Sequence, residues 1–86
     1  MGFYQVRWKR SAAKELKTLP QATLLRVLEA VDTLATDPRP RNARKLTGSE
    51  RTYRIRVGDY RVLYTVEDDM LTVEIVRVGH RRDAYR

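Results

Sequence analysis

The chain contains no cysteine and only one histidine among its 86 residues. The lack of cysteine excludes disulfides, thiolate metal ligands and a cysteine nucleophile, and it is compatible with a reducing compartment. With one histidine and with carboxylates scattered in turns, the sequence also has no metal-ligand spacing. We therefore expect this protein to use no metal ion and no other cofactor.

Long hydrophobic segments are also missing. The chain has no run of about 18 apolar residues, and residues 1–7 lack the apolar stretch of a secretion signal. We therefore expect a cytoplasmic protein that has no membrane contact. Because 86 residues can build one compact core but not two, we expect a single domain over residues 1–86.

Positive charge is abundant. The 18 Lys and Arg residues outnumber the 11 Asp and Glu residues, so that the formal net charge is +7. Neutralising phosphates releases condensed counterions, and a surplus of this size favours nucleic acid as a partner. A merely well-solvated surface is the alternative, and the positions of the basic residues must distinguish the two.

One short strand and two helices are predicted in the first half of the chain. Tyr4, Val6 and Trp8 alternate with polar residues, which indicates a half-buried strand. Ser11 stands where a helix N-cap would, and good helix formers follow it until near Leu19.

The second helix is predicted to begin at Pro20, because proline fits the first turn of a helix. Its apolar residues recur at the spacing of one helical face: Leu24, Val27, Leu28, Val31, Leu34 and Ala35. It must end before Asp37-Pro38-Arg39-Pro40, since proline lacks an amide proton and disfavours helical geometry in the residue before it. A basic loop over residues 41–45 follows.

From Thr52 onward the hydrophobic period changes to two, which predicts three strands. Gly58-Asp59 predicts a tight hairpin turn between the first two strands, and Asp68-Asp69 predicts the next turn. Gly79 is expected to end the last strand. The residues expected to face inward are Tyr53, Ile55 and Val57, then Tyr60, Val62, Tyr64 and Val66, then Leu71, Val73 and Ile75.

These elements predict an α+β fold with the order β-α-α-β-β-β. Two helices are expected to pack on one face of a twisted, mainly antiparallel four-stranded sheet. The polar residues of the strands then fall on the opposite face.

Counting outward from the Gly58-Asp59 turn places Arg56 directly opposite Arg61 on that polar face. Like charges that face each other across a strand pair destabilise it, and this suggests that an anion such as phosphate binds between them. The alternative is that both side chains extend into water.

Other residues are expected on the same face. The count puts Arg54 opposite Leu63, with Glu74 on the other side of Leu63, so that no carboxylate neutralises both arginines. Residues after the last strand can fold over this face and join the site: His80, Arg81, Arg82 and Tyr85.

Three segments of the chain resemble the RelE/ParE toxin superfamily. They are Tyr53-Arg54-Ile55-Arg56, Gly58-Asp59-Tyr60-Arg61-Val62-Leu63-Tyr64 and Val76-Arg77-Val78-Gly79-His80-Arg81-Arg82-Asp83-Ala84-Tyr85. The resemblance covers the whole chain and implies the toxin of a type II toxin-antitoxin system, an endoribonuclease that enters the A site of the 30S ribosomal subunit and cleaves mRNA there. It also implies a cognate RelB-like antitoxin, with the toxin either monomeric or in a hetero-oligomer with it.

The resemblance implies functional roles for Arg54, Arg56, Arg61, Arg81 and Tyr85. Arg61 and Arg81 are expected to clamp the scissile phosphate, and Tyr85 is expected to stack on a base or to move a proton. Further basic residues are candidates for RNA binding: Arg41, Arg44, Lys45 and Arg82. The chain departs from the family in having arginine in the second strand where lysine is familiar, and in a compact spacing from Arg81 to Tyr85.

The chemistry agrees with this set of residues. RNA supplies its own 2′-hydroxyl nucleophile, so that cleavage needs only a general base, a general acid and positive charge around the phosphorane, and no metal. His80 is a candidate base because histidine is the side chain that normally exchanges protons near neutral pH, although a single histidine is more often structural or merely exposed.

Two other functions remain open. The ParE branch of the superfamily poisons DNA gyrase without nuclease activity, but it gives no phosphate-transfer reason for Arg61 together with His80, Arg81 and Tyr85. A passive RNA-binding module explains the charge equally well, but it does not explain the opposed arginines beside a tyrosine.

Overall fold

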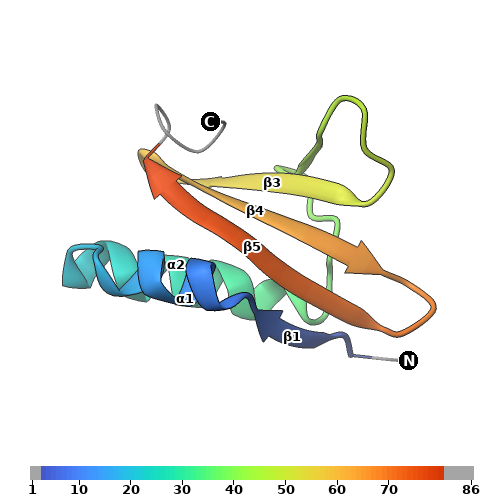
Figure 1. Ribbon diagram of the computed structural model, residues 1–86, viewed down its shortest axis with the longest axis horizontal. Coiled ribbons are helices and arrows are strands. Elements are labelled where there is room, and N and C mark those ends of the chain that lie inside the picture. The colour runs from blue at the N-terminus through green and yellow to red at the C-terminus, as the bar shows by residue number, and fades with distance from the viewer. Residues whose placement is uncertain (1–2, 81–86) are drawn as a thin grey trace.

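The computed structural model describes residues 3–80, which form two helices and one five-stranded sheet (Figure 1). The helices are α1 (Arg10–Lys17) and α2 (Gln21–Leu34). The strands are β1 (Gln5–Trp8), β2 (Arg44–Lys45), β3 (Thr52–Val57), β4 (Tyr60–Glu67) and β5 (Thr72–His80). Their order in the sheet is β1-β5-β4-β3-β2, with β1 parallel to β5 and every other pair antiparallel.

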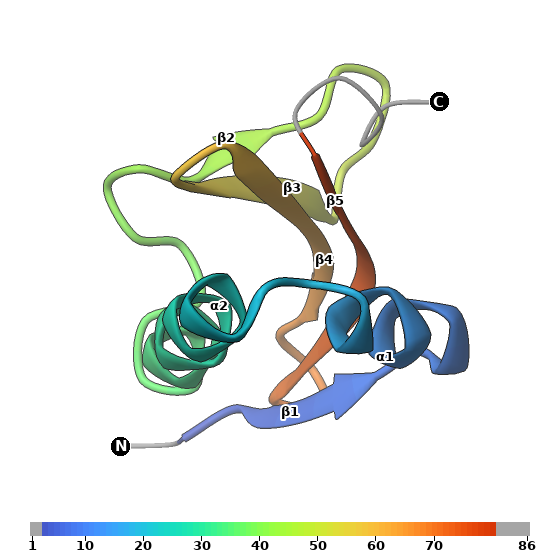
Figure 2. The ribbon, with the colours of Figure 1, turned by 90° about the vertical axis from the view of Figure 1, so that its left-hand side faces the viewer.

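Both helices cover one face of the sheet, and they lie side by side in Figure 2. The core between the two layers is built from the inward positions of the strands and from one face of each helix. Its fully buried residues include Ala12, Val27, Leu34, Val62, Tyr64, Val73 and Ile75. The predicted α+β architecture is therefore confirmed, with one strand more than expected.

Helix α1 begins earlier than the sequence indicates. Its N-cap is Lys9, whose carbonyl accepts from the amide of Ala13, and the expectation that Ser11 caps the helix is wrong. The reason is that β1 runs almost directly into the helix: the Lys9 amide still donates to the carbonyl of Ile75 in β5. Ser11 is left as an exposed residue inside the first turn.

Helix α2 agrees closely with its prediction. Pro20 is the N-cap, one residue before the helix, and its carbonyl accepts from the amide of Leu24. The helix ends at Leu34, ahead of the proline-rich segment, as expected. Neither helix within residues 3–80 has the length and apolarity to cross a membrane.

The β3–β4 hairpin has the predicted register. Arg56 pairs with Arg61, and Arg54 pairs with Leu63. Gly58 in the turn has a φ of 60°, a left-handed conformation that glycine adopts without the clash of a Cβ atom. The register that brings the two arginines together is thus confirmed.

The β4–β5 pair contains a bulge that the sequence does not reveal. Leu63 pairs with Arg77, whereas its neighbour Tyr64 pairs with Ile75, so that one residue of β5 is left over. The expectation that Glu74 lies opposite Leu63 is also wrong: Glu74 pairs with Thr65, on the turn side of the bulge, where the length of the β4–β5 turn sets the register.

The turn between β4 and β5 is also longer than expected. Leu71 has a φ of 47° and is 44% exposed, so its assignment as an inward-facing strand residue is wrong. The amide of Leu71 donates to the carbonyl of Asp68, which draws Leu71 into the turn, and β5 starts at Thr72. At the other end, β5 continues one residue past Gly79 to His80.

The basic loop predicted at residues 41–45 contains strand β2. This two-residue strand pairs Arg44 with Arg54 and Lys45 with Tyr53. The pairing brings a third arginine-bearing strand to the edge of the sheet beside β3.

Candidate nucleic-acid interface

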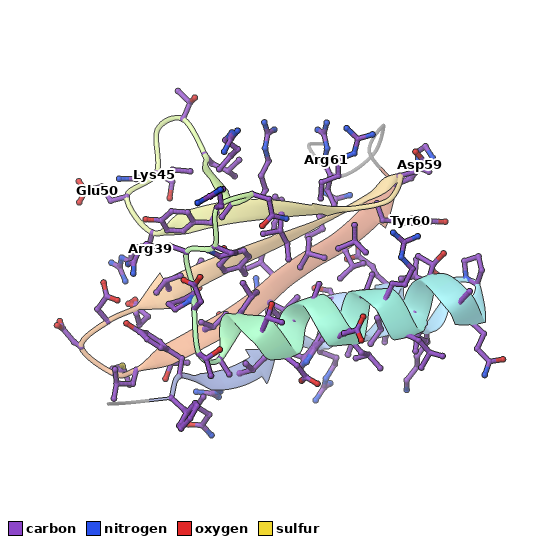
Figure 3. The ribbon with its side chains drawn as sticks, turned by 180° about the vertical axis from the view of Figure 1, so that it is seen from behind. Arg39, Lys45, Glu50, Asp59, Tyr60 and Arg61 are labelled. Atoms are coloured by element: carbon purple, nitrogen blue, oxygen red, sulfur yellow. The ribbon has the colours of Figure 1, made fainter. Side chains whose placement is uncertain are left out.

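The arginines of the hairpin project from the face of the sheet that the helices leave uncovered. In β3, Arg54 and Arg56 alternate with the core residues Ile55 and Val57. Arg61 alternates in the same way in β4. Figure 3 shows Arg61 directed away from the helices, close to the β3–β4 turn that carries Asp59.

These side chains line a groove of about 320 Å³ on the outer face. Its described lining residues are Asn42, Arg44, Arg54, Arg56 and Arg61, and we call it the arginine groove. Two like-charged cross-strand pairs, Arg44 with Arg54 and Arg56 with Arg61, lie next to each other in it. No carboxylate stands among the lining residues that the structure describes, so the groove is an electropositive site suited to phosphate.

Backbone carbonyls orient the guanidinium groups of Arg56 and Arg44. Arg56 donates from Nε to the carbonyl of Gly58 at 2.9 Å. Arg44 donates from Nη1 to the carbonyls of Ala43 and Arg41, at 3.2 and 3.4 Å. Because a guanidinium carries five N–H donors, each of these two side chains keeps donors for an anion.

Leu63 supplies an apolar position beside the arginines. It lies in register between Arg54 and Arg77 and is only 9% exposed, although it does not belong to the core cluster. Arginine stems can pack against such a residue while their charged ends reach solvent or a ligand. Leu63 thus adds an apolar surface to the outer face of β4, next to the arginine groove.

The remaining candidates from the sequence are dispersed. Arg41 and Lys45 are exposed and do not line the arginine groove, since Lys45 is on the opposite side of β2 from Arg44. The ring of His80 packs edge-on against Tyr60, with centroids 5.5 Å apart, and His80 is not among the described lining residues. Three candidates lie outside the described residues: Arg81, Arg82 and Tyr85.

Asn42 lines the groove but was missed by sequence reasoning. A single asparagine in a loop carries no periodicity or motif, and only the pairing of β2 with β3 brings its loop to this face. Arg44 was identified as a basic loop residue, but its position opposite Arg54 could not be foreseen for the same reason.

A separate polar cluster holds the opposite end of the sheet together. Arg39 donates to both carboxylate oxygens of Asp68, at 2.7 and 3.2 Å, and from Nε to the hydroxyl of Tyr53 at 3.0 Å. The hydroxyl of Tyr4 donates to Asp68 at 2.7 Å. The bonds from Arg39 and Tyr4 lower the pKa of Asp68, while the same carboxylate raises the pKa of Tyr4. Arg39 is thus engaged within the protein, away from the arginine groove (Figure 3).

Comparison with known proteins agrees with this geometry. Residues 6–85 match the family described as the ParE toxin of type II toxin-antitoxin system, parDE. The chain belongs to this ParE toxin family. It is also 40% identical over 88 residues to toxin RelG of Mycobacterium tuberculosis, an alignment that spans 96% of this chain and 97% of that protein. The family model thus carries the ParE name, while this relative carries a RelE-type name.

Two solved structures of toxin–antitoxin complexes have a chain of the same fold as this family member. One is RelBE2 from Mycobacterium tuberculosis, with a TM-score of 0.81, 36% identity and coverage of 92% of this chain and 99% of that chain. The other is the archaeal RelE–RelB complex from Pyrococcus horikoshii, with a TM-score of 0.80, 34% identity and coverage of 95% and 99%. The superfamily indicated by the sequence motifs is therefore confirmed.

Proposed function

We propose that this chain is a toxin that binds in the ribosomal A site and cleaves mRNA there without a metal ion. The arginine groove is the observation that carries the proposal. Four guanidinium groups from β2, β3 and β4 surround a space open to solvent on one face of a rigid sheet. Planar guanidinium groups match phosphate oxygens, and their charge stabilises the phosphorane that forms in the transition state.

In the proposed reaction the 2′-hydroxyl of the mRNA attacks the adjacent phosphorus, and the 5′-oxygen of the next nucleotide leaves. Arg61 and Arg56 stabilise the negative charge on the phosphorane, and Arg54 and Arg44 hold neighbouring phosphates. The products are a 2′,3′-cyclic phosphate and a 5′-hydroxyl end. The protein thus needs to supply only a base and an acid beside this charge.

The proton carriers are proposed from the resemblance. Tyr85 is the first candidate, assisted by Arg81, and both lie outside the described residues. His80 is the second, because a histidine imidazole can both accept and donate a proton, and its ring packs against Tyr60 at the end of β5 rather than lining the arginine groove.

We also propose that a RelB-like antitoxin neutralises this chain. Two RelE-type structures similar to this chain are complexes with RelB antitoxins. An antitoxin with acidic residues would complement both the net charge of +7 and the arginine groove. The free toxin then acts as a monomer, and the toxin bound to its antitoxin forms part of a hetero-oligomer.

Mapping mRNA 5′ ends after induction in growing bacteria tests the proposed activity. Wild-type toxin should produce new ends inside translated codons, and Arg61→Ala should lose them. Arg10→Gln is the matched control, because this exposed arginine lies on α1, and it should cut like wild type. Growth arrest without new ends in translated codons contradicts the proposal.

The ParE name of the matching family makes gyrase poisoning the competing activity. It predicts DNA damage and no codon-specific mRNA ends in the same induced cells. A passive RNA-binding module predicts neither result.

A further inference from the structure

A second and larger groove occupies the other end of the uncovered sheet face. It measures about 790 Å³ and is lined by side chains of mixed charge and by hydroxyl groups. Its described lining residues are Arg7, Gly48, Ser49, Glu50, Arg51, Thr52, Thr65, Glu67, Met70, Thr72 and Glu74. We call it the Thr65–Glu74 groove. Figure 3 shows Glu50 at this end of the sheet and Arg61 at the other.

Most polar groups of this groove are already engaged within the protein. Arg51 forms an ion pair with Glu67, which removes one charge of each sign from the groove. Ser49 donates to the hydroxyl of Thr52 at 2.8 Å, and the hydroxyl of Thr72 donates to the carbonyl of Met70 at 2.9 Å. These contacts shape the walls and leave few groups for a ligand.

Thr65 and Glu74 differ from these residues. They pair directly across β4 and β5 in the middle of the sheet, and both side chains are half-buried on the outer face. Within residues 3–80, neither side chain makes a hydrogen bond or an ion pair. A hydroxyl and a carboxylate thus stand side by side on rigid strands, ready to accept and donate hydrogen bonds.

Strand β4 connects the two grooves. Arg61 lines the arginine groove and Thr65 lines the larger one, and four residues of strand span about 13 Å. An RNA strand held by its phosphate at Arg61 therefore reaches the second groove with a neighbouring nucleotide. The carboxylates there repel phosphate but accept hydrogen bonds from the N–H groups of a base.

The charge of the Thr65–Glu74 groove also favours an uncharged ligand group. After the pairing of Arg51 with Glu67, its lining retains Arg7 against Glu50 and Glu74. One surplus negative charge on a protein of net charge +7 attracts a cationic side chain of a partner protein only weakly. A base edge needs no such attraction, because the phosphates bring the strand to the surface.

We propose that the Thr65–Glu74 groove binds a guanine base of the RNA whose phosphate occupies the arginine groove. Guanine carries two adjacent N–H donors, N1–H and N2–H, which match the two oxygens of the Glu74 carboxylate. Its O6 accepts from the hydroxyl of Thr65. The inference rests on the proposed RNA cleavage and adds the base that the site selects.

Binding of uncleavable RNA tests this assignment separately from cleavage. The probes are short 2′-O-methyl oligouridines that contain one guanine, one inosine or neither, since inosine lacks the N2 amino group. Fluorescence anisotropy should show that wild-type toxin binds the guanine strand about tenfold or more tightly than the inosine strand, the usual size of bidentate base discrimination.

Variants assign the selectivity to the groove. Glu74→Gln should reduce the guanine-to-inosine ratio to below about threefold. Thr65→Val keeps the β-branched shape that suits a strand and should weaken guanine binding by a smaller factor. Glu29→Gln is the matched control, because this exposed glutamate lies on α2, and it should retain the wild-type ratio. Arg61→Ala should weaken binding of all three strands alike.

Equal affinity of wild-type toxin for the three strands, or an unchanged ratio in Glu74→Gln, overturns the assignment. A Glu74→Gln variant that binds antitoxin less tightly and keeps its guanine preference also overturns it, because the groove then receives a basic side chain of the partner. Cleavage without guanine selectivity contradicts only this inference. Guanine selectivity without cleavage contradicts only the proposed nuclease.

Discussion

Glu15 completes the hydrogen bonding of β5 beyond the end of β1. The last β1 residue, Trp8, pairs with Ile75, so among residues 3–80 the later part of β5 has no neighbouring strand on that side. There the carboxylate of Glu15 accepts from the amide of Val78 at 2.8 Å and lies 3.6 Å from Nε of Arg77. One side chain of α1 thus holds the end of the strand that leads to His80.

Replacing Glu15 should destabilise the protein measurably. Glu15→Ala leaves the half-buried amide of Val78 without its acceptor, and we expect a loss of about 1 kcal/mol, near the lower end for such groups because the site is partly exposed. The melting temperature should fall by about 4–8 °C in calorimetry. Glu29→Ala, on the exposed side of α2, should melt within about 2 °C of wild type. Equal melting of both variants contradicts this role.

The sequence reveals the positions of some functional residues but not of others. The turn residues Gly58 and Asp59 allow the partners in β3 and β4 to be counted, so the opposition of Arg56 and Arg61 could be predicted. The partner of Glu74 could not, because the turn that begins at Asp68 is two residues longer than Asp68-Asp69 alone suggests, and β5 starts only at Thr72. Within residues 3–80 Glu74 pairs in register with Thr65 and Arg7 but makes no side-chain hydrogen bond or ion pair, which became visible only in the structure.

At the scale of elements, the pairing of β2 with β3 creates the arginine groove. Four cations held on three adjacent strands repel one another, and an anion bound among them offsets this repulsion. Strand β2 was not predicted because two residues are too few to show a hydrophobic period. The arginine groove thus depends on the pairing of β2 with β3, although most of its residues could be named from the sequence.

Sulfate, as a stand-in for phosphate, should stabilise the groove. At matched ionic strength, replacing chloride by sulfate should raise the melting temperature of wild type by about 4–8 °C, the effect of about 1 kcal/mol of linked binding. Arg61→Ala should gain much less, while Arg10→Gln should gain as much as wild type. The same gain in all three proteins would indicate only the general exclusion of sulfate from protein surfaces.

The Asp68 cluster joins three elements that are distant in the sequence. Asp68 follows β4, Arg39 lies in the connection after α2, and Tyr4 precedes β1. Because the folded protein lowers the pKa of Asp68 below its ordinary value of 3.8, the stabilisation is fully present above that value. It is lost as the pH falls through the pKa of the folded state.

Asp68→Asn should therefore lower the melting temperature at neutral pH. The difference from wild type should shrink as the pH is lowered below about 3.8, because the carboxylate becomes protonated in the unfolded chain first and in the folded protein only at the lowered pKa. Calorimetry of both proteins between pH 7 and pH 3 makes the comparison, with Asp69→Asn in the same turn as the control. A difference that stays constant over this range would show that the charge of Asp68 does not matter.

At the scale of the whole molecule, the helices and the uncovered sheet face have separate tasks. The helices bury the apolar side of the sheet, and the grooves lie on its polar side. The hydrophobic periods of the sequence predict this division well because they report which face is buried. They cannot predict the shape of the polar face, which depends on the twist, the bulge and the loop that precedes β3.

The net charge of +7 should make antitoxin binding sensitive to salt. Raising the ionic strength from about 0.05 M to about 0.3 M should increase the dissociation constant of the complex at least tenfold, because the charges that steer association are screened. Titration calorimetry with the cognate antitoxin measures this change. Arg61→Ala should show a smaller salt dependence than Arg10→Gln, and an affinity that does not change with salt argues against an acidic partner on this face.

The most direct test of the proposed nuclease is single-turnover cleavage of an mRNA bound to purified ribosomes with an empty A site. Wild-type toxin should yield 2′,3′-cyclic phosphate and 5′-hydroxyl ends, and one 2′-deoxy substitution at the cleaved nucleotide should abolish the reaction. Arg61→Ala should lower the rate constant about a hundredfold or more, with Arg10→Gln unchanged. Cleavage of the deoxy-substituted mRNA, or a wild-type rate in Arg61→Ala, would contradict the account.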